Sequence, residues 1–467
     1  MKRLGFSLVS CVLAASVAGC SSGGGSPVPR GLLPTSGSGS TPIQHIVVLV
    51  QENRTFNNLF AQFPGATGTI IGKKKTGTGK KAKVEPINLT EVNLEDHLNL
   101  VHLYAGYLTG LDSGKMDAFN QIIMLTSKKT EGAKPYQYVN PAQIQPYWTM
   151  ASTYGLANMM FSTQGSGSFT AHQDLIRGGT AITSGESLID DPTSPYIWGC
   201  DSAPGTQTSL ITTGLQYEKN AGPLPCTTAF PYSGTGYETL RDTLDAQSVS
   251  WKYYTPQLSP GLPGALWDAF DVIAPVRYGS EWGTNVSWPQ TKIFTDITKN
   301  QLAAMSWVIP DASNSDHPGY SSDTGPSWVT QVVNAIGESS YWDSTAIIVV
   351  WDDWGGFYDP VAPPPADTQG GPGFRVPMIV ISPYARETSS SQPGYISNTV
   401  YGFGSIIKFV EETFNLPSLG TTDQSSNSIS DMFNFNQTPR QFQTIGSKYS
   451  RAFFLHQKPS GLPVDTQ

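Results

Sequence analysis

The sequence predicts an α/β fold, a three-layer α/β/α sandwich built on a mainly parallel sheet with a loop-rich cap. Two largely apolar runs rich in β-branched residues support this, at residues 43–50 (IQHIVVLV) and 346–351 (AIIVVW). Such runs are typical of strands that are buried on both faces, as in a parallel sheet covered by helices. An amphipathic helix at residues 326–340 leads into the second run and supplies the crossover that parallel strands need.

The other elements follow in chain order. Strands are predicted at residues 158–162, 250–254, 305–309 and 375–382, and helices at 97–120, 141–154, 237–247 and 403–414. Residues 163–176 are predicted to be a Gly/Ser loop followed by a helix. The loops and aromatic residues of about 184–300 indicate a cap or a set of insertions. The chain from residue 418 onward is predicted to be irregular.

Composition excludes some classes of protein. Charged residues make up 14% of the 467 residues, with 47 glycines and 35 prolines, which is typical of a compact, loop-rich globular protein. The formal net charge is −8. A net acidic chain argues against a nucleic-acid partner.

The N-terminus has the features of a secretion signal. Two basic residues, Lys2 and Arg3, precede an apolar segment that is too short to span a bilayer. We expect a signal peptide at residues 1–19, followed by a lipidated Cys20 and a flexible tether over residues 20–41. The protein would then be exported and lipid-anchored in the bacterial cell envelope, at the outer membrane facing the periplasm or outside the cell. An ordinary cleaved signal is the alternative.

Two further cysteines, Cys200 and Cys226, lie in the exported part. An oxidising compartment favours a disulfide between them. Two reduced, buried thiols are the alternative.

Oxygen-bearing side chains follow the two apolar strands directly: Glu52 and Asn53 after the first, and Asp352 and Asp353 after the second. Ligands of open α/β sheets bind beyond the carboxyl ends of the strands. Carboxylate and amide oxygens are suited to a divalent cation. A solvated turn at each strand end is the alternative reading.

Three further segments carry candidate functional groups. The Gly/Ser loop that begins at residue 163 and leads into a helix could offer a nucleophilic hydroxyl and backbone amides for an anion, although a plain turn fits that loop as well. Asp316 and His317 lie beyond the strand at 305–309. His102 lies on one side of the helical pattern at 97–120 and could face the site, with an ordinary hydrogen-bonded core histidine as the alternative. Residues 67–87 hold six lysines in an expected exposed hairpin, which could contact anionic lipid or substrate or be a solvated insertion.

Six segments resemble, in order, the bacterial phosphoesterase family, which contains non-haemolytic phospholipases C and acid phosphatases and is similar in fold to alkaline phosphatases. The segments are HIVVLVQENRTFNNLF, MMFSTQGSGSFTAHQDLI, WVIPDASNSDHPG, WDDWGGFYDPV, RVPMIVISPYAR and ISNTVYGFGSIIKFVEETFNLPSLGTTD. The resemblance implies a phosphoesterase domain over residues 42–467.

The resemblance also implies roles for particular residues. It implies one divalent metal ion (calcium, magnesium, manganese or zinc) held by Glu52, Asn53, Asp352 and Asp353. Ser168 would be the nucleophile, although Ser162 and Ser166 lie in the same loop. The groups that would hold phosphate oxygens or protonate the leaving group are His102, His172, Asp316 and His317.

Two positions depart from the family pattern. Thr170 stands where relatives commonly have proline, and Asn398 stands where many have histidine. The change at Asn398 is expected to alter rate or specificity if that histidine assists the leaving group.

The predicted function is therefore metal-dependent hydrolysis of phosphate esters through a phosphoserine intermediate, of the acid phosphatase or phospholipase C type. The substrate would be a phospholipid or a small phosphomonoester, and the chain would meet the membrane through its anchor at Cys20. A non-catalytic surface lipoprotein that binds phosphorylated ligands is the alternative.

Overall fold

The computed structural model describes residues 41–77, 79–96, 98–193, 198–223, 226, 237–257, 267–320, 322–367, 370–388 and 394–462. The predicted signal peptide, the anchor at Cys20 and all but the last residue of the tether lie outside these residues, and they stay predictions. Residues Ser36–Gln467 form one compact unit.

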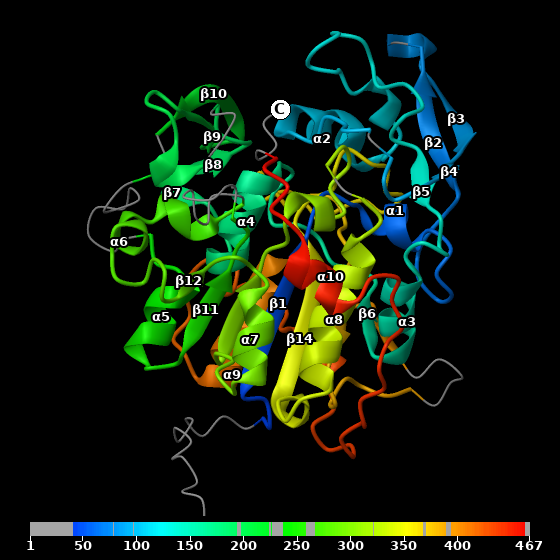
Figure 1. Ribbon diagram of the computed structural model, residues 1–467. Coiled ribbons are helices and arrows are strands. Elements are labelled where there is room, and N and C mark those ends of the chain that lie inside the picture. The colour runs from blue at the N-terminus through cyan, green and yellow to red at the C-terminus, as the bar shows by residue number, and fades with distance from the viewer. Residues whose placement is uncertain are drawn as a thin grey trace, which may run out of the picture. The chain divides into compact units, whose positions relative to one another are not determined.

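An eight-stranded sheet forms the centre of this unit (Figure 1). Its order is β12 (Val286–Ser287), β11 (Trp251–Tyr254), β13 (Met305–Val308), β1 (His45–Gln51), β14 (Thr345–Trp351), β15 (Met378–Ile381), β6 (Gly155–Ala157) and β16 (Tyr395–Ser397). β1 pairs in parallel with both β13 and β14, whereas β15 runs antiparallel to β14 and β6. The sheet is thus mainly parallel, as predicted.

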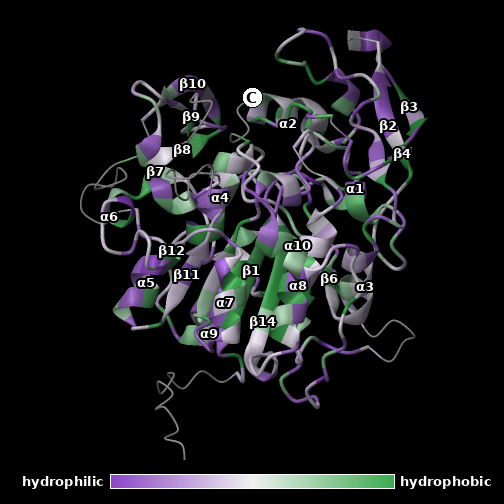
Figure 2. Ribbon diagram, viewed as in Figure 1, coloured by the Kyte–Doolittle hydropathy of each residue, from purple (hydrophilic) through white to green (hydrophobic). Residues whose placement is uncertain are grey.

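Helices cover both faces of the sheet. On one face, α8 (Gly325–Gly337) packs against α3 (Gln145–Thr153), α7 (Lys292–Thr298) and α10 (Arg451–His456). On the other, α4 (Ser168–Arg177) packs against α5 (Leu240–Ala246) and α9 (Phe403–Phe414). Figure 1 shows α7 and α8 in front of the strands and α9 behind them. The hydrophobic colouring of β1 and β14 in Figure 2 marks the core between these layers, which confirms the predicted α/β fold.

Smaller elements surround the carboxyl ends of the main strands. A four-stranded sheet contains β7 (Ala181–Thr183), β8 (Glu186–Ile189), β9 (Thr208–Thr212) and β10 (Gln216–Gly222). Two-stranded pairs join β2 (Ile71–Thr76) to β3 (Lys83–Asn88) and β4 (Thr90–Val92) to β5 (Gln137–Val139). The remaining helices are α1 (Phe56–Phe60), α2 (Tyr104–Leu111) and α6 (Ala274–Arg277).

The expected exposed hairpin is present as β2–β3, and the predicted disulfide joins Cys200 to Cys226. Within the described residues, no helix combines the length and the apolar character that crossing a membrane would require.

Several predicted boundaries differ from the structure. The helix expected over 97–120 is confined to Tyr104–Leu111. Just before it, the His102 side chain contacts Asn53, beyond the end of β1, instead of continuing a helix. The strand expected at 158–162 is reduced to single bridges at Met160 and Phe161, and the regular strand β6 precedes it. The C-terminal segment expected to be irregular contains α10. β11 and β12 lie within the range 184–300 yet belong to the main sheet, so only part of that range stands apart from it.

A buried ion pair joins the loop after β14 to the segment before β15. Arg375 donates to Asp359 Oδ1 from Nε at 2.9 Å and to Oδ2 from Nη2 at 3.1 Å, and both side chains are fully buried. Asp359 Oδ2 also accepts from the backbone amide of Asn57 at 3.1 Å. The pair therefore connects three segments that surround the sheet edge.

We predict that Asp359→Asn lowers the free energy of unfolding by about 3–5 kcal/mol, because it leaves the buried Arg375 guanidinium without its counter-charge. Urea unfolding followed by fluorescence measures this. The control Glu85→Gln breaks the exposed contact with Lys74 (4.0 Å) and should cost less than about 1 kcal/mol. Equal losses in the two variants would contradict the structural role given to Arg375 and Asp359.

Candidate active site

The polar residues after β1 and β14 meet at one point because the two strands run in parallel and in register. Gln51 pairs with Trp351 at the ends of the strands, so the next residues leave the sheet together. The backbone amide of Asn53 donates to Asp352 Oδ1 at 2.8 Å. Glu52, Asn53, Asp352 and Asp353, the four predicted metal ligands, are all fully buried at this edge.

The backbone must turn sharply to hold these groups together. Asn53 has a φ of 56° and Gly355 a φ of 58°, both in the left-handed region. A Cβ on Gly355 would lie 2.1 Å from the carbonyl oxygen of Asn53, so only glycine fits there. The two glycines of the DDWGG segment therefore allow the two strand ends to touch.

Glu52, His172 and Asp352 form a cluster of possible metal ligands. Their ligand atoms all lie within 4.8 Å of one another. His172 Nε2 is 2.8 Å from Glu52 Oε1 and 3.8 Å from Asp352 Oδ2. Burial lowers the pKa of His172 to about 4, which keeps its imidazole neutral and able to coordinate a cation.

The carboxylates of this cluster fit a bound cation. Glu52 Oε2 and Asp352 Oδ2 are buried and have no hydrogen-bond partner. Burial, together with the negative charge of neighbouring acids, raises the pKa of Glu52, Asp352 and Asp353, so their ionised forms are costly without a positive charge nearby. A ligand set of two carboxylates and one imidazole suits manganese or zinc as well as harder cations.

Ser168 lies beside this cluster at the first position of α4, after the N-cap Gly167. Its Oγ donates to Asp353 Oδ2 at 3.1 Å and lies 3.3 Å from Asn53 Oδ1. Two of the four predicted metal ligands thus face the serine, while the other two face His172. The two other loop serines are engaged elsewhere: Ser166 bonds with Asp190, and Ser162 donates to the carbonyl of Gln164.

Two of the predicted histidines flank the serine side of the cluster. His102 Nδ1 donates to the carbonyl of Leu100 at 2.7 Å, so Nε2 can accept from Asn53 Nδ2 at 3.0 Å. The ring of His317 lies 6.4 Å from that of His102 and stacks on Trp267 at 5.8 Å. His102 lies just before α2 rather than on a helix, and Trp354 Nε1 donates to its carbonyl.

Asp316 has a different environment from the other candidates. Its Oδ2 accepts from the hydroxyl of Tyr147 at 2.7 Å, and its carbonyl accepts from Arg54 Nε at 2.8 Å. Burial raises the pKa of Asp316 to about 6. These contacts give Asp316 a part in holding the loop that carries His317.

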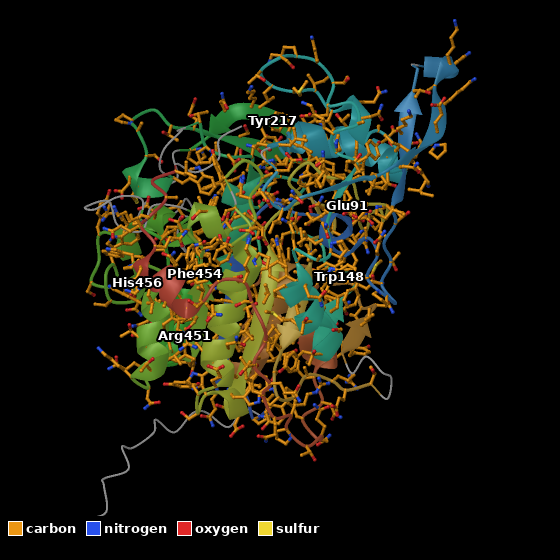
Figure 3. The ribbon with its side chains drawn as sticks, turned by 45° about the vertical axis from the view of Figure 1, so that its right-hand side comes forward. Glu91, Trp148, Tyr217, Arg451, Phe454 and His456 are labelled. Carbon is orange, nitrogen blue, oxygen red and sulfur yellow. A yellow bond between two sulfur atoms is a disulfide. The ribbon has the colours of Figure 1, made fainter. Side chains whose placement is uncertain are left out.

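Asp190 and Asp191, which follow β8, also lie close to the start of α4 and were not predicted as site residues. Asp191 Oδ1 accepts from the backbone amide of Phe169 at 2.9 Å, at the N-terminus of α4. Asp190 Oδ2 accepts from the hydroxyl of Tyr217, which is labelled on β10 in Figure 3, at 2.8 Å. A weak signal was available, since an Asp-Asp pair follows the apolar end of a short strand here, as one does after β14. Because Asp191 occupies an amide at the start of α4, the backbone cradle expected there is partly filled.

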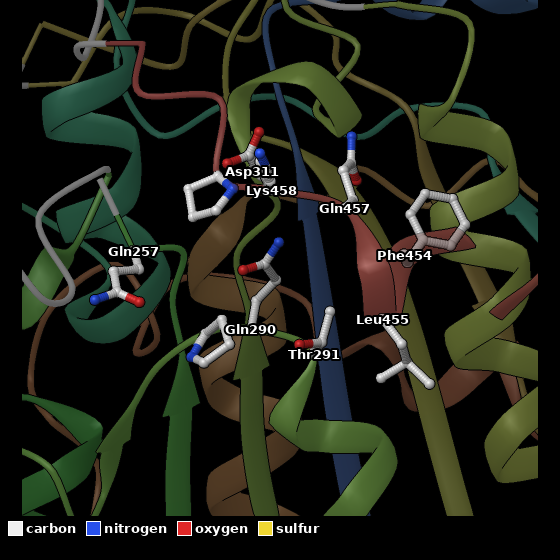
Figure 4. A pocket seen from close by; sticks show the side chains of 10 residues that line it. Gln257, Gln290, Thr291, Asp311, Phe454, Leu455, Gln457 and Lys458 are labelled. Atoms are coloured by element: carbon white, nitrogen blue, oxygen red, sulfur yellow. The ribbon is translucent and has the colours of Figure 1, made fainter. Parts of the chain in front are cut away.

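Two other features lie apart from the cluster. A cavity of about 140 Å³ lies between the loops after β12 and β13 and the segment around α10, and Gln290, Asp311 and Gln457 are among its lining residues (Figure 4). None of the predicted site residues lines it.

Asn398 lies after the edge strand β16 and accepts from Asn158 Nδ2 at 2.7 Å. β15 and β6 separate that strand from β14.

The family model described as "Phosphoesterase family" matches residues 43–417. The chain belongs to this family. The resemblance inferred from the six segments is therefore confirmed.

Similar curated proteins are named as phospholipases C. The chain is 24% identical over 432 residues to "Non-hemolytic phospholipase C" of Burkholderia pseudomallei, covering 80% of this chain and 55% of that protein. It is also 24% identical over 456 residues to "Phospholipase C A" of Mycobacterium tuberculosis, covering 85% of this chain and 78% of that protein. This phosphoesterase thus spans about half the length of the non-hemolytic phospholipases C that it matches.

Among solved structures, one similar chain is a protein of the alkaline phosphatase superfamily from Vibrio parahaemolyticus. It has a TM-score of 0.34 and 13% identity, and the match covers 87% of this chain and 76% of that chain.

We predict that Asp352→Asn lowers the metal content of the purified phosphoesterase at least tenfold, because even the loss of a residue that only supports a metal ligand commonly lowers metal affinity about 10–100-fold. Plasma mass spectrometry of the desalted protein measures bound metal. The matched control Asp343→Asn makes the same change at an exposed position just before the other end of β14. Unchanged metal content in Asp352→Asn would rule out this cluster as the metal site.

Proposed function

We propose that this phosphoesterase hydrolyses phosphate esters in two displacements, with Ser168 as the nucleophile. The observation that carries the proposal is the position of Ser168 Oγ, 3.1 Å from Asp353 Oδ2 at the start of α4 and beside the Glu52–His172–Asp352 cluster. A hydroxyl is a weak nucleophile until a neighbouring group takes or disperses its proton.

Asp353 is placed to accept the proton of Ser168. Its Oδ2 already accepts the hydrogen bond from the serine, and its Oδ1 is held by the backbone amide of Gly355 at 2.7 Å. Burial and the adjacent Asp352 raise the pKa of Asp353, which makes it a stronger base than an exposed carboxylate. Asn53 keeps the serine oriented through its Oδ1.

In the first displacement, Ser168 Oγ forms a bond to phosphorus and the ester P–O bond breaks. The leaving alcohol takes up a proton, for which His102 or His317, in its protonated form, is the candidate donor among the predicted residues. In the second displacement, water attacks the phosphoserine and gives its proton to the histidine that protonated the leaving alcohol. The Oγ–P bond breaks, and Ser168 takes back its own proton from Asp353. Little else is required of the protein beyond positioning and electrostatic stabilisation.

A divalent cation fits the three buried ligands Glu52, His172 and Asp352. Bound there, it would offset their negative charge and stabilise the charge that develops on the phosphoryl oxygens. Asn53 and Asp353, which the sequence also assigned to the metal, would act mainly on Ser168.

The similar proteins named phospholipase C favour a phosphodiester lipid as substrate. In that case, cleavage on the glycerol side would release diacylglycerol and leave the phosphorylated head group on Ser168. An acid phosphatase activity on small monoesters is the alternative within the same chemistry.

We predict that Ser168→Ala lowers kcat on para-nitrophenyl phosphorylcholine by about 10³-fold or more, as loss of a catalytic nucleophile commonly does. The control Ser162→Ala, in the same loop, should change kcat by less than about tenfold because its hydroxyl only bonds to a local carbonyl. Release of para-nitrophenol measures both rates. Equal rates in the Ser168→Ala variant and the unmodified chain would contradict the nucleophile assignment.

A comparison of two chromogenic substrates, with and without chelator, separates the two activities. Preference for para-nitrophenyl phosphorylcholine would support the phospholipase C type, and preference for para-nitrophenyl phosphate the phosphatase type. Hydrolysis of neither substrate with divalent metals added would favour the non-catalytic alternative.

A further inference from the structure

The β2–β3 hairpin projects from the body in the direction in which β1 and β14 run toward their carboxyl ends (Figure 1). Its strands pair from Ile71 with Asn88 to Thr76 with Lys83. Figure 2 shows the hairpin as predominantly hydrophilic, in contrast to the central strands, and Figure 3 shows side chains ending in nitrogen at its tip. Nothing in the proposed chemistry requires this element.

The hairpin is strongly basic in an acidic protein. Residues 67–87 contain six lysines and one glutamate, a net charge of +5, whereas the whole chain carries −8. Two of the lysines have acidic neighbours: Lys74 lies 4.0 Å from Glu85, and Lys75 lies 2.5 Å from Asp112. The four other lysines are exposed: Lys73, Lys80, Lys81 and Lys83.

Apolar side chains are exposed among these lysines. Ile71 is 55% exposed and Val84 is 53% exposed, and Ile70, just before the hairpin, is 41% exposed. Ile71, Lys73 and Lys75 alternate along β2, so their side chains lie on the same face of the hairpin. Val84 pairs with Lys75 across the hairpin, so its side chain lies on that face too. Exposed branched aliphatics beside lysines are typical of a surface that enters the boundary of a lipid bilayer.

Strand β2 of the hairpin is fixed to the body of the protein at Lys73 and Lys75. The hydroxyl of Tyr136 donates to the carbonyl of Lys73 at 2.7 Å, and Asn120 accepts from the amide of Lys75 at 3.1 Å. The ring of Tyr136 lies 5.1 Å from that of Tyr358, which belongs to the same loop as Asp353. The hairpin therefore has a fixed orientation relative to the carboxyl ends of β1 and β14, and so would any surface bound to it.

We propose that the β2–β3 hairpin is a docking surface for an anionic phospholipid membrane. Its exposed lysines attract the negatively charged lipid head groups, and Ile71 and Val84 insert at the boundary between head groups and acyl chains. Each lysine near an anionic surface strengthens binding about fivefold. Nucleic acid would match the charge of the hairpin but would leave the exposed aliphatic side chains without a partner. The inference goes beyond the proposed hydrolysis, because docking requires no catalytic step.

Vesicle co-sedimentation tests the proposal with a chain that begins at Ser36, the start of the compact unit, and carries Ser168→Ala. This chain lacks the leader and Cys20, so no predicted acyl anchor contributes, and lipid is not consumed. We expect binding to vesicles of phosphatidylcholine with phosphatidylglycerol, and at least tenfold weaker binding to phosphatidylcholine alone. The added variant Lys80→Gln/Lys81→Gln should weaken binding to the anionic vesicles by about tenfold or more.

Two further variants make the result specific to the hairpin. The matched control Lys292→Gln/Lys299→Gln removes two exposed lysines at α7 and should leave binding unchanged. Ile71→Ser/Val84→Ser should remove the part of the binding that persists in high salt. Circular dichroism checks that each variant is folded.

The proposal would be overturned if the anionic vesicles were not bound, if both lysine pairs had equal effects, or if only a DNA duplex were bound. These outcomes do not depend on catalysis. With Ser168 intact, hairpin variants should hydrolyse a soluble chromogenic ester at the normal rate, so failure of docking and failure of the proposed hydrolysis can be distinguished.

Discussion

The burial of Glu52, Asp352 and Asp353 at the carboxyl ends of β1 and β14 is the constraint on which the rest of the site depends. Ionised carboxylates removed from water are costly unless positive charge or hydrogen bonds compensate them. Backbone amides supply part of the compensation, at Asp352 from Asn53 and at Asp353 from Gly355. Two carboxylate oxygens without partners remain, beside a neutral imidazole. A cation bound by this cluster would offset the remaining negative charge.

The surrounding structure serves to hold these charges close. The left-handed turns at Asn53 and Gly355 bring the two strand ends into contact, and the tight approach of Gly356 to Leu100 positions the segment that carries His102. The ion pair of Arg375 and Asp359 fixes the far end of the same loop. Asp191 caps α4 at Phe169, which sets the start of the helix on which Ser168 and His172 lie four residues apart. One turn of α4 therefore supplies both the serine and a possible metal ligand.

The central strands and their polar ends could be predicted because a strand buried on both faces leaves a continuous apolar run, and parallel strands end at a common edge. The separation of roles within the predicted ligand set could not be predicted. Asn53 and Asp353 face Ser168, whereas His172 joins Glu52 and Asp352. The sequence does not reveal these directions, because they depend on the turns after the strands and on which side of α4 faces the strand ends. His102 was placed on a helix since its neighbours have helical spacing, yet packing against the DDWGG loop decides its position. Asp190 and Asp191 were missed although they repeat the pattern of Asp352 and Asp353.

The most direct test of this account is to trap the covalent intermediate on Ser168. The purified chain would be mixed with para-nitrophenyl phosphorylcholine, quenched in acid within the first turnover and digested for peptide mass spectrometry. The account predicts a phosphorylcholine adduct on the peptide that contains Ser168, at that residue, and none on Ser162 or Ser166. An adduct on another residue, or rapid turnover with water attacking directly and no adduct at any quench time, would contradict it.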